Sequence, residues 1–188
     1  MRPRRSIIPQ RAPIFIGCEG QSEVGYAGWL RNMVRDRNLP FHLELSDLGR
    51  GAGDPFARID MAIERVMRWE ANRDTFVARY VFLDTDQLAA DRSRAEQACR
   101  RAREGGIIVI WQQPTHEAFL LRHFPGRNAN QPPDKRAADM ALVKEWADYR
   151  KPSSPREIER RLQLEGAHRV AALLPELADL LRKVGLLD

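Results

Sequence analysis

The chain has 188 residues, of which 43% are hydrophobic. That length allows one sizeable core and is short for two, so we expect one domain with a helical tail. The formal net charge of +5 suits a polyanionic partner such as nucleic acid, although a solvated arginine-rich surface explains it equally well.

Cysteine and hydropathy patterns exclude several other classes. Cys18 lies in an apolar run and Cys99 in a helical stretch, so neither a disulfide framework nor a cysteine zinc site is expected. No apolar run approaches the roughly 20 residues that span a bilayer, and no signal-peptide core follows the basic opening. We therefore expect a cytoplasmic protein with no membrane partner.

The first half of the chain shows regular apolar patterns after a basic arm at residues 1–11. Ile14–Cys18 is an apolar run typical of a buried parallel strand, and Ser22 is predicted to cap the helix that follows. Phe41–Leu45 alternates, which indicates a half-exposed strand nearer an edge. Asp54 then caps a helix whose buried face runs to Trp69.

Two further strands are predicted before residue 124. Arg79–Leu83 is followed by a helix at about Ala89–Arg103, which Gly105 and Gly106 end. Ile107–Trp111 has no polar alternation, so we expect it in the centre of the sheet, with a short helix beyond Pro114. Strands that alternate with helices predict a mostly parallel, three-layer α/β sheet over residues 12–124.

Residues 125–188 are predicted to be a helical extension packed on the same domain. A loop rich in proline and asparagine runs to Lys135. Helices are then expected at about Met140–Trp146, Ile158–Leu164 and Val170–Leu181, with Pro175 dividing the last.

Acidic residues follow three of the four predicted strands: Glu19 with Glu23, Asp84 with Asp86, and Glu117. Because ligands bind beyond the carboxyl ends of parallel strands, we expect these acids to meet at one rim. Their mutual repulsion favours a cation with oxygen ligands, Mg²⁺ or Mn²⁺. Taken singly, Glu23 is also explained as a first-turn acid and Asp86 as a helix cap.

Four segments in this order resemble known families. Phe15–Glu23 looks like the strand-Glu-Gly-x-x-Glu opening of Toprim-like domains, and Phe82–Asp86 looks like their Asp-x-Asp motif. Gln113–Phe124 is similar to the Asn-Pro-x-Phe-Glu-x-Trp-Leu-Leu-x-His-Phe segment of RloB-like proteins, and Tyr149–Lys151 resembles their Tyr-x-Lys. The chain departs from the third pattern at Gln113, His116 and Ala118, whereas the acids are retained.

The resemblance implies a Toprim-like fold, related to the nuclease domain of OLD-family proteins. It also implies a role in bacterial or phage-linked defence, often beside an ATPase partner. In such a nuclease Glu19, Asp84 and Asp86 would hold Mg²⁺ and orient the nucleophile. Glu23 and Glu117 would serve a second ion or act as general base. Lys151 would stabilise the transition state, unless it is only a solvated loop lysine.

Basic and aromatic residues near these segments have two interpretations. Arg122, Arg127 and Lys135 would guide nucleic acid to the rim or simply form a charged loop. His123 is expected to be structural, and core packing is favoured over base stacking for the remaining aromatic candidates, Trp111, Trp146 and Tyr149.

Two rival functions are considered beside the nuclease. The Asp84-Thr85-Asp86 segment also resembles the nucleophile loop of haloacid-dehalogenase-like phosphatases, but it comes late in the chain and is followed by Leu88 where Thr or Val is usual. A non-catalytic binding or signalling subunit is the stronger alternative. The sequence leaves open whether the substrate is DNA or RNA and whether the chain forms a homo-oligomer.

Overall fold

The computed structural model describes residues 11–49, 54–86, 88 and 92–188. The predicted basic arm therefore lies outside the described residues, except for Arg11. Among the described helices none is both long enough and apolar enough to cross a membrane.

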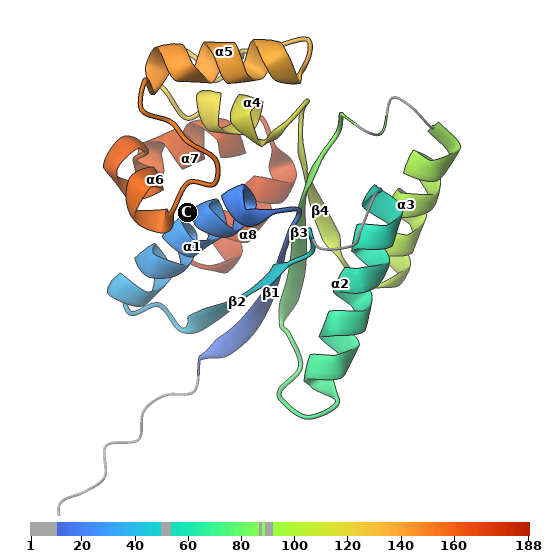
Figure 1. Cartoon of the computed structure of the whole chain (residues 1–188). Helices are drawn as coiled ribbons and strands as arrows, with labels where there is room; N and C mark the ends of the chain where they lie inside the picture. Colours follow the sequence, from blue (N-terminus) through green and yellow to red (C-terminus); the bar gives the residue numbers. More distant parts are fainter. Residues whose placement is uncertain (1–10, 50–53, 87, 89–91) are drawn as a thin grey trace, which may run out of the picture.

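A four-stranded parallel sheet forms the middle layer, with strand order β2-β1-β3-β4. The strands are β1 (Ala12–Cys18), β2 (Phe41–Asp47), β3 (Ala78–Asp84) and β4 (Ile108–Gln112). Helices cover both faces of this sheet (Figure 1), which confirms the predicted three-layer, Rossmann-like α/β fold.

The two outer layers are unequal. One face is covered by α2 (Pro55–Glu70) and α3 (Arg92–Glu104). The other face is covered by α1 and the helices of the C-terminal half (Figure 1). These are α1 (Gln21–Asp36), α4 (His116–Leu121), α5 (Lys135–Glu145), α6 (Pro155–Arg161), α7 (Leu164–Ala171) and α8 (Pro175–Lys183).

Alternation along the strands supplies a separate core to each face. Ile14 and Ile16 of β1 pack in a cluster with α1 and the C-terminal helices, which contribute Leu142 and Leu177. Phe15, the residue between them, joins the smaller cluster beneath α2 and α3. Because successive side chains of a strand point to opposite faces, one strand serves both cores. The C-terminal helices share a core with the sheet, while the division at residue 124 stays a prediction.

The predicted position of the fourth strand is wrong. Among the described residues β4 pairs with β3 alone and is therefore an edge strand, and Ile108 is exposed. Its apolar sequence arises because α3 packs against one face of the strand while α4 and α8 pack against the other. A strand buried on both faces reads as apolar even when one of its edges is free. The prediction that β2 lies at an edge is confirmed.

Helix starts follow the capping chemistry in some places and not in others. Asp54 caps α2 as predicted, since its carboxylate accepts a hydrogen bond from the Ala57 N–H (3.0 Å). Ser22 as the cap of α1 is wrong, because Gly20 occupies that position and its N–H donates to Glu23 Oε2 (3.0 Å). In the C-terminal half Pro175 begins α8, which confirms the predicted break there.

The predicted limits of the other C-terminal helices are partly wrong. α5 already begins at Lys135, because Asp134 caps it by accepting a hydrogen bond from the Ala137 N–H (2.8 Å). Ser154 and Pro155 start α6 in the same way, and two non-helical residues, Leu162 and Gln163, then separate it from α7.

Candidate carboxylate site

The structure brings the five predicted acids to one rim of the sheet. Glu19 follows β1, Asp84 is the last residue of β3, and Glu117 lies in the first turn of α4 beyond β4. The remaining two, Glu23 and Asp86, act electrostatically on the same carboxyl group, that of Asp84. Carboxyl ends of parallel strands meet at one edge, which explains how residues far apart in the sequence converge.

Asp84 is the centre of this group. Its Oδ1 is buried and has no hydrogen-bond partner among the described residues. Burial, followed by the charges of Glu23 and Glu19 and of the other two acids, raises the pKa of Asp84 to about 9. A carboxyl group in this position is therefore stable as the neutral acid or as the ligand of a cation.

Glu19 is held from two sides. Its Oε2 accepts a hydrogen bond from the backbone N–H of Asp84 (2.7 Å), and its Oε1 pairs with Arg58 Nη1 (2.5 Å). Burial nevertheless outweighs these contacts and raises the pKa of Glu19. Sequence reasoning missed Arg58, which is only 8% exposed on α2. The sequence offers little signal of it, because an arginine on an amphipathic helix does not reveal a partner from another part of the fold.

Glu23 lies close to His116, the buried first residue of α4, which also contacts Gln112 at the end of β4. His116 Nδ1 is 3.6 Å from Glu23 Oε1, and the same nitrogen is hydrogen-bonded to Gln112 Nε2 (2.7 Å). His116 occupies the position where the family resemblance predicts an aromatic residue. Its ring still stacks on Phe119, with centroids 5.9 Å apart, so it fills the aromatic place and adds a polar contact.

Glu117 receives two side chains from the Tyr-x-Lys segment. The Tyr149 hydroxyl donates to Glu117 Oε1 (3.0 Å), and Lys151 Nζ lies 2.7 Å from the same oxygen. Burial alone would raise the pKa of Glu117, but Lys151, His116 and Tyr149 outweigh it and lower that pKa. Glu117 is thus an ionised, buried carboxylate with a cationic partner.

Lys151 joins two helices at the rim. It pairs with Glu117 of α4 and with Asp139 Oδ1 of α5 (3.2 Å). Burial alone would lower the pKa of Lys151, but these two carboxylates outweigh it and raise the pKa. The sequence did not single out Asp139, because a lone acid on an amphipathic helix gives no signal of a distant lysine.

A close helix contact positions the Tyr149–Lys151 segment. The backbone of Gly25 in α1 packs tightly on the loop that follows Lys151. A Cβ at Gly25 would lie 1.9 Å from the Ser153 carbonyl oxygen of that loop. Only glycine allows this approach without a shift of the loop. The segment that carries Lys151 is therefore fixed against α1, the helix that carries Glu23.

Asp47 is an acid at the same edge of the sheet that sequence reasoning missed. It ends β2, accepts a hydrogen bond from Gln21 Nε2 (2.5 Å), and contributes with burial and Glu23 to raising the pKa of the Cys18 thiol. The predicted strand stopped at Leu45, so Asp47 was not recognised as a strand-end residue. All four strands in fact end near an acid.

The predicted nucleic-acid contacts do not join the carboxylate group. Arg122 donates to the carbonyl oxygens of Gln113 (2.6 Å) and Asn130 (3.0 Å). Arg127 pairs with Glu145 (2.6 Å), and Lys135 is exposed at the start of α5.

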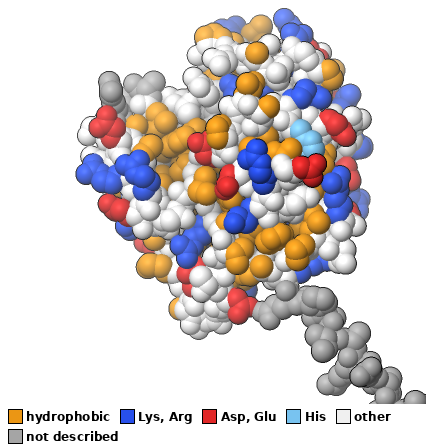
Figure 2. Space-filling model, turned by 180° about the vertical axis from the view of Figure 1, so that it is seen from behind, with side chains coloured by type: hydrophobic (Ala, Val, Ile, Leu, Met, Phe, Trp, Pro, Cys, Tyr) orange, Lys and Arg blue, Asp and Glu red, His pale blue; other side chains and the backbone are white. Residues whose placement is uncertain are grey.

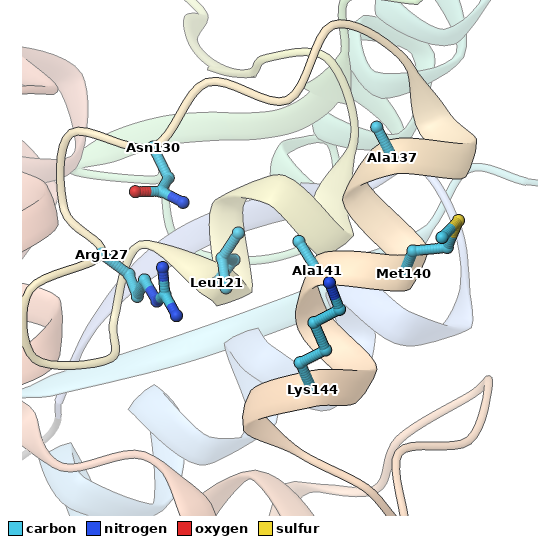
Figure 3. Close-up of a pocket in the computed structure, with 7 residues that line it drawn as sticks. All are labelled: Leu121, Arg127, Asn130, Ala137, Met140, Ala141 and Lys144. Atoms are coloured by element: carbon cyan, nitrogen blue, oxygen red, sulfur yellow. The ribbon is translucent and has the colours of Figure 1, made fainter.

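Arg127 and Asn130 also line a hollow of about 330 Å³ between the loop and α5. Figure 3 shows Lys144 and Met140 of α5 on its other side. The lining residues of this hollow include none of the five acids. Figure 2 shows Lys and Arg side chains interspersed with acidic ones over the face that it displays, so the net positive charge does not form one patch there.

Three further candidates, His123, Trp146 and Tyr149, are buried. His123 is buried, and its two ring nitrogens bond the Tyr26 hydroxyl (3.0 Å) and the Phe119 carbonyl (3.0 Å). Burial lowers the pKa of His123 to about 3. Trp146 and Tyr149 are buried in the larger core, as predicted.

The donor atoms suit a hard divalent cation. Every acid at the rim offers oxygen, and the unpartnered Asp84 Oδ1 is the kind of buried atom that a cation would satisfy. In the described part of the chain, however, no group of three or more His, Cys, Asp or Glu side chains is already arranged to hold a metal. Binding would therefore require some of these side chains to move closer together.

Fold and site together define an α/β protein with a carboxylate site beyond the carboxyl ends of its parallel strands. The chain belongs to the RloB-like family, since the family model described as RloB-like protein matches residues 14–178. No curated protein and no solved structure shows significant similarity to the chain.

Proposed function

We propose that the chain is a nucleic-acid phosphodiesterase that depends on Mg²⁺ or Mn²⁺. The observation that supports this most is the environment of Asp84. Its pKa of about 9 reflects burial among four other acids, and its Oδ1 has no partner among the described residues. A divalent cation would remove the repulsion that the chain itself leaves uncompensated.

The proposed roles follow from the partners of each side chain. Glu19, Asp84 and Asp86 would hold the cation, with Glu23 beside them. When bound, the ion would polarise a phosphate and lower the pKa of a water molecule. Glu117, which Lys151 and Tyr149 keep ionised, would accept a proton from the attacking water. Lys151 would offset the negative charge that develops on the phosphate.

A cellular role is proposed on the family resemblance. RloB-like membership and the Toprim-like motifs suggest bacterial or phage-linked defence in the cytoplasm, often beside an ATPase partner. The positive net charge of +5 supports a nucleic-acid substrate but does not choose between DNA and RNA.

The test compares three substrates and two variants. Purified protein is incubated with plasmid DNA, single-stranded DNA and structured RNA in Mg²⁺, Mn²⁺ or EDTA. We expect metal-dependent cleavage of at least one substrate that falls about 10³-fold in Asp84→Asn. The matched control Asp36→Asn changes an exposed acid at the end of α1 and should cleave like the wild type. Equal cleavage by both variants would exclude Asp84 as a ligand.

One observation favours a second candidate, a non-catalytic binding or signalling subunit. Glu19 and Glu117 are already neutralised by Arg58 and Lys151, and the described side chains form no ready ligand set. Calorimetric titration with Mg²⁺ separates the two functions. Metal binding without cleavage of any substrate, alone or with an ATPase partner, would favour the subunit.

A further inference from the structure

The outer edge of β2 is open for another strand. The Ala12 N–H donates to the Pro40 carbonyl at one end of the β1–β2 ladder, and the Leu48 N–H donates to the Cys18 carbonyl at the other. Successive residues of a strand direct their backbone N–H and C=O groups alternately toward its two neighbouring strands. These two bonds therefore fix which residues of β2 face β1. The residues that turn their backbone groups away from β1 are then Phe41, Leu43, Leu45 and Asp47.

Most of these outward groups have no protein partner. Within the described part of the chain only the Asp47 carbonyl is bonded, by Arg65 Nη1 (2.5 Å). The N–H and C=O groups of Phe41, Leu43 and Leu45 on this side have no hydrogen bond to any described residue. A row of such groups is a template for pairing with a further strand.

β2 also lacks several of the features that usually protect an edge, although Glu44 is charged and Arg65 covers the Asp47 carbonyl. It has seven residues, none of them Lys or Pro, and its register with β1 runs without a bulge from Phe41 to Asp47. The opposite edge differs, because β4 has only five residues. Short strands, Pro, Lys and bulges are the common devices against edge pairing, so β2 is the edge that can accept a partner.

The side chains of β2 are complementary to themselves in one register. His42 and Glu44 lie on the same face, with Nε2 and Oε2 3.3 Å apart, and their side chains are 49% and 35% exposed. In an antiparallel pair centred on Leu43, each His42 lies opposite Glu44 of the second copy. A shift to the next allowed register in either direction would place His42 opposite His42 or Glu44 opposite Glu44.

The other face of β2 agrees with the same register. There Phe41 would lie opposite Leu45 of the second copy, and Leu43 opposite Leu43. All three are partly or fully buried against the larger core, so the pairing would extend an apolar surface. Apolar and opposite-charge pairs directly across two strands both stabilise a sheet.

We propose that two copies of this chain associate through antiparallel pairing of their β2 edges, with Leu43 opposite Leu43. The two sheets would form one continuous sheet about a twofold axis. Because the paired strands run in opposite directions, the carboxyl ends of the two sets of strands would point in opposite directions. The two carboxylate sites would therefore lie at opposite ends of the strands in that sheet. Each site would then be open to its own stretch of nucleic acid.

Disulfide cross-linking tests the register directly. Two variants, His42→Cys and Glu44→Cys, are made in a Cys99→Ser background, in which the remaining Cys18 is fully buried. Positions 42 and 44 form a non-hydrogen-bonded pair in the proposed register, where Cα atoms lie about 4.5 Å apart and a disulfide fits. The mixed sample should cross-link at least about tenfold faster than either variant alone. In a dimer of one variant, the two introduced cysteines would be diagonal neighbours and not directly opposite one another. Faster cross-linking of one variant with itself, or none in the mixture, would overturn the proposal.

Sedimentation equilibrium tests the association itself. The wild type should dimerise, and His42→Glu should raise the dissociation constant about tenfold or more, since it creates two symmetric pairs of like charges. Combining His42→Glu with Glu44→Lys should restore dimerisation. Glu64→Lys, at an exposed position of α2, is the matched control and should leave it unchanged. A monomeric wild type, or a dimer indifferent to His42→Glu, would contradict the interface.

Discussion

Two groups of buried ionisable side chains on the same side of the sheet differ in how their polar atoms are satisfied. Around Asp84 four other acids gather, its buried Oδ1 has no partner among the described residues, and its pKa rises to about 9. Around His123 both ring nitrogens are bonded, the ring packs edge-on to Tyr26 and Phe119, and the pKa falls to about 3. The second arrangement stabilises the fold, whereas the first costs stability and offers charge to a ligand.

Truncation of the satisfied group should have the largest effect on stability. We expect His123→Ala to lower the free energy of unfolding by about 3 kcal/mol, because it opens a cavity and leaves the Tyr26 hydroxyl buried without a partner. Tyr26→Phe keeps the ring and should cost only about 1 kcal/mol. Urea titrations of both variants measure the difference. Equal losses would mean that packing at His123 contributes little.

The pH dependence of stability should reveal that the two groups act in opposite directions. The pKa of His123 is depressed, so below pH 6.5 the unfolded state binds a proton that the folded state does not. This contribution makes the protein less stable as the pH is lowered. The pKa of Asp84 is raised to about 9, so the folded state holds the extra proton and stability rises as pH falls from 9. Between pH 6.5 and about 4 the two effects offset one another in the wild type.

Removal of one of these two ionisable side chains should reveal the pH dependence that the other contributes. In Asp84→Asn without metal, the His123 contribution is unopposed, and stability should fall by about 2 kcal/mol between pH 6.5 and 5. His123→Gln should show the opposite trend over the same range. Urea unfolding in EDTA at several pH values measures both slopes. Parallel slopes for the two variants and the wild type would contradict the assignment.

The sequence predicted the acids of this comparison better than their partners. Glu19 and Asp84 follow apolar strands, so the parallel-sheet rule placed them correctly at one rim. Arg58 and Asp139 gave little signal, because a pairing across the fold depends on tertiary packing that no local pattern records. The edge position of β4 was missed for a related reason, since burial of both faces hides the free edge of a strand.

A smaller effect is expected from neutralising Asp84 at constant pH. Without metal at pH 8, Asp84→Asn should raise the free energy of unfolding by about 1 kcal/mol, because the amide keeps the shape and removes the cost of protonating a carboxyl group that is ionised in the unfolded chain. Thermal unfolding in EDTA measures the gain, and Asp36→Asn should be neutral. Mg²⁺ should then stabilise the wild type and not the variant, since a ligand stabilises only the form that binds it. A destabilised Asp84→Asn would show that the carboxylate has a structural partner.

The ion pair between Lys151 and Glu117 is intermediate between the satisfied surroundings of His123 and the unsatisfied surroundings of Asp84. Its removal should give the smallest change in the free energy of unfolding. Glu117 is 4% exposed, which resembles the buried group, but Lys151 is 41% exposed, so water screens its charge. We therefore expect Lys151→Met to cost at most about 1 kcal/mol of stability, far less than removal of one partner from a fully buried pair. Lys144→Met, at an exposed position of α5, is the matched control for urea unfolding. A loss above about 3 kcal/mol would place this pair with the satisfied core. The expected small loss, together with a large decrease in cleavage, would place Lys151 with the acids at the rim.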